Sequence, residues 1–175
     1  MDFRVSREAF LRVLTHVSSI VDSRSTIPIL SNIYLKCENN QIEIRSTDLD
    51  ISIREFVSAD STKNGEATVS SRILTDIIRK TKKNSIVKCK LEGNRLIINS
   101  DNSVFELNAL TADEFPKFVA LDPSNAFEIT IQQMKRIFNK TKFAISAEET
   151  RYYLNGIYFH TVSNGTKTTL RCVAT

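Results

Sequence analysis

The chain has 175 residues and a formal net charge of +4 at pH 7, with 41% apolar residues, four glycines and three prolines. This composition is typical of a folded globular chain and excludes collagen-like and low-complexity disordered proteins. No stretch is long and apolar enough to span a bilayer, and the first residues form no apolar signal core, so we expect a cytoplasmic protein. The positive charge favours a polyanionic partner without establishing one.

The first elements follow the apolar spacing. We expect a strand over residues 1–5, and then a helix over residues 7–20 that Ser6 caps. Alternating apolar residues predict three strands between positions 33 and 56, the first two joined by a turn at 38–40.

The same order of elements recurs inside the first 120 residues. A shift of 64 positions aligns Val5-Ser6 with Val69-Ser70, which predicts a strand ending in a second helix cap. In that second helix we expect four apolar side chains to point inward: Ile73, Leu74, Ile77 and Ile78. Strands over 86–91, 95–99 and 104–110 complete the copy. Residues 1–120 therefore predict two β-α-β-β-β units that bury each other's helices.

A longer repeat appears at a shift of 124 positions, where Phe3 aligns with Phe127 and Tyr34 with Tyr158. Such a repeat indicates a protein built from equivalent domains. We predict a third unit with a strand from residue 127, a helix over 131–142 and strands over 153–161 and 168–173. The expected domains are residues 1–122 and an incomplete half over residues 123–175.

Few residues point to catalysis. The histidines His16 and His160 are isolated, and the chain contains no phosphate-binding loop or nucleophile motif. Asp48 and Asp50 could hold a divalent ion, but their place between two strands favours turn capping. The three cysteines are far apart in sequence, which predicts reduced, buried thiols without a metal. We expect no cofactor and no enzyme activity.

The basic residues are more informative because each predicted helix carries several of them. Equivalent helices in stacked units would place positive charge on one surface and favour contacts with phosphate. A solvated helix face is the simpler explanation of the charge alone. The basic residues on or just after the three helices are Arg7, Arg12, Arg72, Arg79, Lys80, Lys82, Lys83, Lys135, Arg136, Lys140 and Lys142.

Five segments, in this order and spacing, carry a resemblance over the whole chain. They are Thr26-Ile-Pro-Ile-Leu-Ser-Asn32, Thr47-Asp-Leu-Asp50, Asp113-Glu-Phe-Pro116, Arg151-Tyr-Tyr-Leu-Asn-Gly156 and Val173-Ala-Thr175. The chain resembles the bacterial DNA polymerase III beta subunits, the sliding clamps. The resemblance implies an α+β DNA-clamp fold, with helices on one face of antiparallel sheets. It also implies a homodimeric ring of three similar domains per chain, of which the third lies outside these residues.

The resemblance further implies a role without catalysis. The ring would encircle duplex DNA, independent of sequence, and bind DNA polymerase III, other polymerases, the clamp loader and repair proteins through short peptides. The implied DNA-binding residues are Arg24, Arg72, Arg79, Lys80, Lys135, Tyr152 and Tyr153. The implied partial peptide pocket is Arg151, Leu154 and Thr175, and the implied subunit contact is Phe105 and Leu107, on a strand with an unpaired edge.

One residue departs from the family pattern. Glu148 stands where the family has a glutamine in the loop that faces DNA, and a carboxylate there should weaken a phosphate contact. Two other functions stay open from the residues alone. The first is a metal-dependent nucleic-acid-modifying enzyme that uses Asp48 and Asp50, and the second is a protein-interaction module with incidental positive charge.

Overall fold

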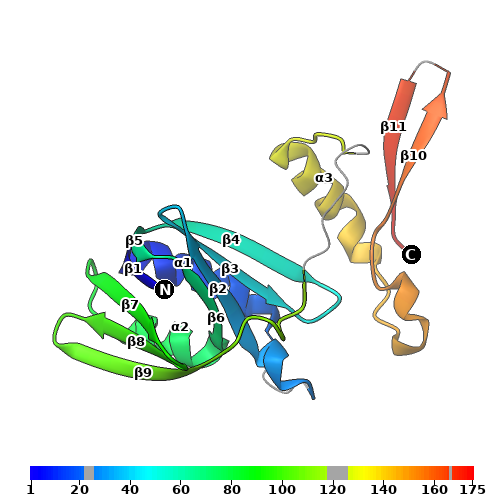
Figure 1. Ribbon diagram of the computed structural model, residues 1–175. Helices are drawn as coiled ribbons and strands as arrows, with labels where there is room; N and C mark the ends of the chain where they lie inside the picture. The colour runs from blue at the N-terminus through cyan, green and yellow to red at the C-terminus, as the bar shows by residue number, and fades with distance from the viewer. Residues whose placement is uncertain (22–25, 118–125, 166) are drawn as a thin grey trace. The chain divides into compact units, whose positions relative to one another are not determined.

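The computed structural model describes residues 1–21, 26–117, 126–165 and 167–175. The chain divides into two compact units, Met1–Val119 and Ala120–Thr175, and each is described by itself (Figure 1). Among the described residues, no helix is both long and apolar enough to cross a membrane. Of the predicted junction, residues 118–125 lie outside the described part, so the boundary after residue 122 stays a prediction.

Unit 1 is a nine-stranded antiparallel sheet with two helices, which confirms the expected α+β class. Its strand order is β4-β3-β2-β6-β9-β8-β7-β1-β5. The helices are α1 (Arg7–Val17) and α2 (Ser71–Lys80), with short 3-10 turns at Ser18–Ile20 and Pro28–Ser31. The strands are β1 (Asp2–Ser6), β2 (Asn32–Glu38), β3 (Gln41–Thr47), β4 (Ser52–Ser58), β5 (Asp60–Lys63), β6 (Gly65–Ser70), β7 (Ile86–Glu92), β8 (Arg95–Ser100) and β9 (Ser103–Leu110).

The pairing confirms that two equivalent halves build unit 1. The first strand of each half pairs with the second strand of the other, β1 with β7 and β6 with β2. A matching irregularity occurs near the end of each half. The amide of Ala59 donates to the carbonyl of Asn40 at 3.0 Å, and the amide of Ala109 donates to that of Asn94 at 2.8 Å. The short strand β5, which the sequence did not predict, continues β4 past Ala59 and pairs with β1.

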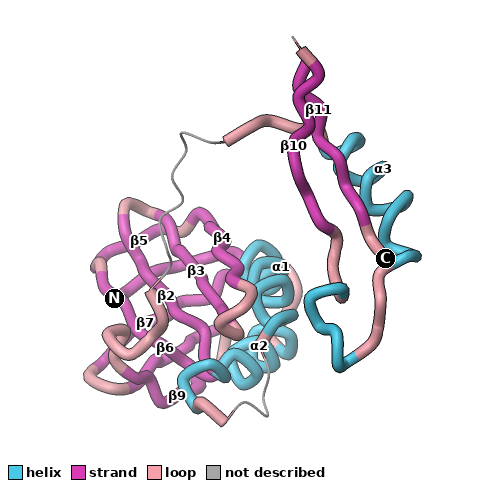
Figure 2. Tube along the Cα trace, turned by 90° about the vertical axis from the view of Figure 1, so that its right-hand side faces the viewer, coloured by secondary structure: helices cyan, strands magenta, loops and turns pink. Residues whose placement is uncertain are grey.

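Both helices lie on one side of the sheet and contact each other (Figure 2). Their inward residues are fully buried, among them Phe10 and Leu14 on α1 and Leu74 and Ile78 on α2. The prediction for Ile73 was wrong: its side chain is 53% exposed, because the helix turns it away from the stripe that Leu74 and Ile78 occupy. The buried stripe fixes how each helix faces the sheet, and so fixes which side chains remain outside.

The caps differ between the helices. Ser6 occupies the N-cap position of α1 but makes no side-chain cap, contrary to our expectation. Ser70 accepts a hydrogen bond from the amide of Ile73, at 3.5 Å. In unit 2, Thr130 and Gln133 form a reciprocal capping box at the start of α3. The equivalent helices thus begin at equivalent positions through different contacts.

Unit 2 consists of α3 (Ile131–Thr141), two 3-10 segments (Lys142–Ala144 and Glu149–Leu154) and the hairpin of β10 (Tyr158–Asn164) and β11 (Lys167–Val173). The predicted strand from residue 127 was wrong, since residues 126–130 form no strand. The predicted strand over 153–161 begins only at Tyr158. None of the side chains described in this unit is buried, whereas unit 1 has an extensive core.

Candidate nucleic-acid interface

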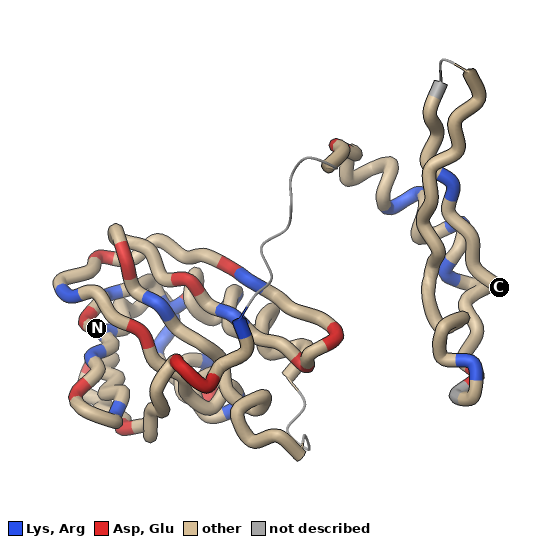
Figure 3. The backbone as a smooth tube through the Cα atoms, turned by 45° about the vertical axis from the view of Figure 1, so that its right-hand side comes forward, with Lys and Arg blue, Asp and Glu red and all other residues tan. Residues whose placement is uncertain are grey.

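The cations on the strands of unit 1 are mostly neutralised by neighbouring carboxylates. Six of them pair with an acidic residue of the same sheet: Lys36 with Glu38, Arg45 and Arg54 with Glu43, Lys88 with Asp2, Lys90 with Glu92 and Arg95 with Glu106. Figure 3 shows the acidic residues spread along the strands and turns of this unit. Among the described residues, only Arg4 and Lys63 are strand cations of unit 1 without such an ion pair.

The cations of the helical side are different. Within the described part of unit 1, five exposed cations on α1, on α2 and just after α2 have no carboxylate within ion-pair distance: Arg12, Arg72, Lys80, Lys82 and Lys83. Arg79 is exposed too, but its guanidinium donates to Asp76 at 2.8 Å. The uncompensated positive charge of unit 1 is therefore concentrated on its helices.

Two of the predicted DNA-binding residues come together in one hollow. Arg72 and Arg79 line a cavity of about 790 Å³ between α2 and the end of α1. Its floor carries hydroxyl groups: Ser18 Oγ lies 2.7 Å from Ser71 Oγ and 3.0 Å from Thr75 Oγ1. Asp76, the partner of Arg79, lines the hollow too, so Arg72 supplies its uncompensated guanidinium. A guanidinium group beside hydroxyl donors suits an anionic ligand such as phosphate.

Arg7 does not belong to this exposed set, although the sequence counted it among the helix cations. It is only 9% exposed and its guanidinium donates to carbonyl oxygens at the end of α2. The sequence could not distinguish it from Arg12, because both lie on the same predicted helix. Arg24, another predicted DNA contact, lies outside the described residues.

In unit 2, the predicted DNA-binding residues lie on two elements. Lys135 is exposed on α3. Tyr152 and Tyr153 are 78% and 71% exposed on the 3-10 segment Glu149–Leu154, with their rings edge to face and their centroids 6.1 Å apart. Exposed aromatic rings beside basic residues suit contact with a nucleic acid.

Glu148 binds a residue of the predicted peptide pocket. Arg151 Nε donates to Glu148 Oε2 at 2.9 Å, and Arg151 Nη2 forms an ion pair with the same oxygen at 2.6 Å. Thr150 Oγ1 donates to Glu148 Oε1 at 2.9 Å. Glu148 therefore neutralises the cation nearest to the two tyrosines in sequence. The sequence did not predict this contact, since it suggested only that the Glu148 carboxylate would weaken a contact with DNA phosphate.

The other two pocket residues lie near the same loop. Leu154 ends the 3-10 segment and is half-buried. The carbonyl of Thr175 accepts a hydrogen bond from the amide of Ser146 at 3.2 Å, which ties the last residue to the start of the loop that carries Arg151. These contacts place Thr175 beside that loop, although the pocket itself stays a prediction.

Comparison with known proteins decides the family. The family model for the N-terminal domain of the DNA polymerase III beta subunit matches residues 1–120, and the family model for its central domain matches residues 128–175. The chain belongs to the DNA polymerase III beta subunit family. The resemblance that rested on the five segments is thereby confirmed.

Individual members agree with this assignment. A beta sliding clamp of Caulobacter vibrioides is 41% identical over 177 residues, which cover 100% of this chain and 48% of that protein. Two solved structures, of Caulobacter crescentus pol III beta and of a Bartonella birtlesii sliding clamp bound to griselimycin, have TM-scores of 0.91 and 0.94 at 41% and 36% identity. Each is covered to 47%, and this chain to 100%. The chain spans about half the length of the curated relatives it matches.

The strand predicted to carry the beta-subunit dimer contact is β9. This strand lies in the middle of the strand order, between β6 and β8. Residues 103–108 pair with β8 on one side, and on the other side only Ala109 and Leu110 pair with β6. Leu107 is 6% exposed and belongs to the core of unit 1, and Phe105 is half-buried against that core. Their role in a subunit contact stays a prediction.

The acidic residues considered for catalysis have structural contacts. Asp48 Oδ1 accepts hydrogen bonds from the amides of Asp50 and Ile51 at 3.0 and 2.6 Å, which is the turn capping that the sequence favoured. His16 Nδ1 lies 2.6 Å from Glu55 Oε1, at the surface. Within the described residues, no group of three or more His, Cys, Asp or Glu side chains is placed to hold a metal ion.

Proposed function

We propose that this chain supplies the first part of a DNA sliding clamp, a non-catalytic ring that encircles duplex DNA and confers processivity on the replicative polymerase. Residues 1–175 would provide the first domain and part of the second. The ring, in the family's architecture, is a homodimer that also uses a third domain. A closed ring cannot leave DNA sideways, so each phosphate contact can be weak and the ring can still slide.

One observation carries the proposal: in the described part of unit 1, most cations of the sheet are paired with carboxylates, whereas most exposed cations on or just after the helices are not. A protein surface with uncompensated positive charge attracts phosphate, and each phosphate contact releases counterions whatever the base sequence. The helical side is thus the side suited to DNA, and the neutral sheet side suits the outer wall of a ring.

The proposed partners follow from the same arrangement. Polymerases, the clamp loader and repair proteins would dock short peptides beside Arg151, Leu154 and Thr175. Tethering of this kind raises the local concentration of a polymerase at the primer end. We also propose a cytoplasmic location at the nucleoid, because duplex DNA is the expected partner.

The proposal can be tested by the salt dependence of DNA binding. Fluorescence anisotropy of a labelled duplex would be measured with the chain over a range of salt concentrations, and repeated with a duplex of unrelated sequence. The variant is Arg72→Gln with Lys80→Gln, on α2. The matched control is Lys36→Gln with Lys90→Gln, which removes the same charge from the sheet.

We expect both duplexes to bind equally and the α2 variant to lower the slope of log affinity against log salt by about 2, because each lost contact contributes about 0.9. The sheet control should leave the slope close to that of the parent chain. Equal effects of the two variants would refute the helical side as the DNA side. Absence of salt-dependent binding by the parent chain would favour a protein-interaction module instead.

A further inference from the structure

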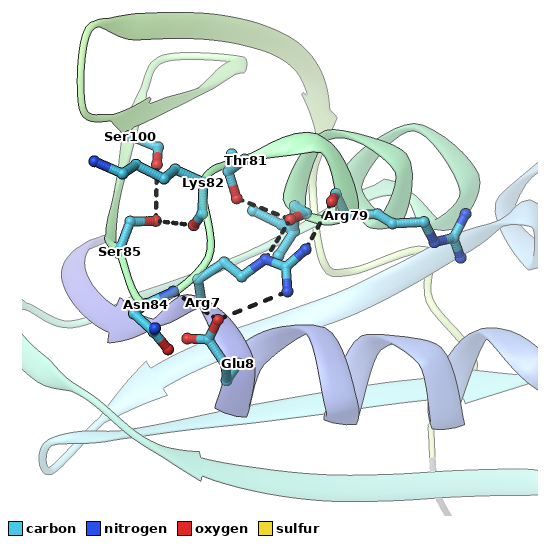
Figure 4. Close-up of polar contacts among 9 residues, drawn as sticks. Arg7, Glu8, Arg79, Thr81, Lys82, Asn84, Ser85 and Ser100 are labelled. Carbon is cyan, nitrogen blue, oxygen red and sulfur yellow. Dashed lines mark hydrogen bonds and ion pairs between the residues drawn. The ribbon is translucent and has the colours of Figure 1, made fainter.

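Arg7 joins the start of α1 to the end of α2. Its side chain is 11% exposed, and it reaches two carbonyl oxygens in the last turn of α2 (Figure 4). Nε donates to the oxygen of Ile78 at 3.1 Å and Nη2 donates to the oxygen of Arg79 at 2.7 Å. The planar guanidinium makes both contacts at once, which a single ammonium group cannot reproduce in the same geometry.

These contacts act on a helix end that needs them. The last carbonyls of an α-helix have no partner within the helix, and they carry the negative end of its dipole. The amide of Thr81 satisfies the oxygen of Ile77, and Arg7 reaches the next two oxygens, of Ile78 and Arg79. Thr81 Oγ1 adds a second hydrogen bond to Ile78, at 2.8 Å. Arg7 therefore fixes the direction in which the chain leaves α2.

The first residues of α1 also hold the chain at Asn84 and Ser85, four to five residues after the end of α2. The amide of Asn84 donates to Glu8 Oε1 at 2.8 Å, and the amide of Arg7 donates to the carbonyl of Ser85 at 3.0 Å. The hydrogen bond from Asn84 also lowers the pKa of Glu8, so this carboxylate stays charged. Ser85 Oγ closes the segment with a 2.8 Å hydrogen bond to the carbonyl of Lys82.

The segment between these two anchors is strongly basic. Residues 79–83 read Arg-Lys-Thr-Lys-Lys, so four of five residues carry a positive charge, and all four are exposed. Such a segment repels itself electrostatically and would spread if it were held at one end only. Arg7 and Glu8, which are consecutive residues, supply anchors at both ends.

We infer that Arg7 is a positioning residue for DNA binding: it holds the basic segment 79–83 so that its cations meet the phosphates together. This inference rests on the proposed function. Because Arg7 is itself buried, it is not expected to contact a phosphate, and we expect its effect on the number of phosphate contacts to act through the segment that it holds.

The test compares Arg7→Met, Arg7→Lys and the parent chain. Methionine keeps an unbranched buried side chain but donates no hydrogen bond. Lysine keeps the charge and one point of attachment. Ile42→Val, a core substitution on β3, serves as a control that lowers stability without touching the segment. For each folded protein, the salt slope of duplex binding is measured below its unfolding temperature, together with amide hydrogen exchange of Thr81 and Asn84.

In Arg7→Met we expect faster exchange at both amides and a salt slope reduced by about 1 to 2, one unit for each lysine that no longer meets a phosphate. Arg7→Lys should recover part of the slope, and Ile42→Val should retain all of it. In addition, Lys82→Gln with Lys83→Gln should lower the slope by about 2 in the parent chain and by less in Arg7→Met.

Three results would overturn the inference. A folded Arg7→Met protein with faster exchange and the parent's slope would leave Arg7 a role in stability alone, while the proposed DNA binding stands. A parent chain that binds duplex DNA without salt dependence would remove both the proposed function and this inference. If Arg7→Met does not fold, an unchanged slope in Arg7→Lys, with its single attachment, would count against positioning.

Discussion

Replacing Glu148 by glutamine should tighten DNA binding, and the structure shows why the effect has two parts. Glu148 pairs with Arg151 through one hydrogen bond and one close ion-pair contact to the same carboxylate oxygen, and both side chains are about half exposed. Glu148→Gln removes a negative charge from the loop that precedes Tyr152 and Tyr153. It also releases Arg151 from its only ion pair within the described residues. The variant therefore gains one uncompensated cation where the parent chain has a neutral pair.

The size of the effect follows from counterion release. One additional phosphate contact steepens the slope of log affinity against log salt by about 0.9. If the two lines meet near 1 M salt, the variant binds about 15-fold more tightly near 50 mM and about 4-fold more tightly near 200 mM. The lost ion pair is exposed, so the free energy of unfolding should fall by only about 0.2–1 kcal/mol.

The assay is the anisotropy titration described for the proposed function. Its matched control is Glu106→Gln, which makes the same charge change and frees Arg95 from an exposed pair with a 2.7 Å contact on the sheet. We expect the slope to steepen for Glu148→Gln and to stay nearly constant for Glu106→Gln. Equal slopes for Glu148→Gln and the parent chain would remove Glu148 from the DNA path. An equal steepening of the slope in both variants would show that the effect comes from the change in net charge and not from the position of Glu148.

Two further predictions concern unit 1. Leu74→Ala should lower the free energy of unfolding, measured in urea, by about 2–5 kcal/mol because Leu74 is fully buried. Ile73→Ala, on the exposed side of the same helix, should change it by less than about 0.5 kcal/mol. Similar losses in the two variants would contradict the observed orientation of the helix. Burial raises the pKa of the Cys37 and Cys89 thiols, so at pH 8 a thiol reagent should modify only Cys172 quickly in the native protein; a second fast thiol would contradict this.

The sequence predicted the architecture of unit 1 well because the helix starts and the alternating strands are both encoded by residues close together in the chain. The shift of 64 positions located both helix starts, and alternating apolar residues located the strands that face the core. The strand β5 was missed because Asp60–Lys63 contains no apolar residue. Its pairing comes from the neighbouring strand β1 and not from its own pattern. Ile73 was misplaced because the four apolar residues span an arc of about 140° around the helix, and Ile73 lies at the exposed edge of that arc.

The third unit was predicted less accurately for a related reason. Residues 127–130 match the first strand of unit 1 in sequence, yet a strand forms only where a partner strand supplies hydrogen bonds. In unit 1, β1 obtains these bonds from β7, which belongs to the other half. The described part of unit 2 holds one helix and one hairpin, so residues 126–130 have the sequence of a strand without a pairing partner. Similarity between repeats therefore predicts local elements better than it predicts pairing.

The candidate site divides in the same way between local and distant information. The repeated basic helices were visible in the sequence, because a helix can be recognised from its own residues. The sequence did not show which cations lack a carboxylate partner, because those contacts join residues far apart in the chain. Lys88 on β7 pairs with Asp2 on the neighbouring strand β1, and Arg7 points inward to the helix that begins 64 residues later. The ion pairs on the sheet matter as much as the free cations on the helices: a surface that attracts phosphate on one side only can orient itself on DNA, whereas uniform charge could not. This asymmetry is what the variants of α2 and of the sheet are designed to separate.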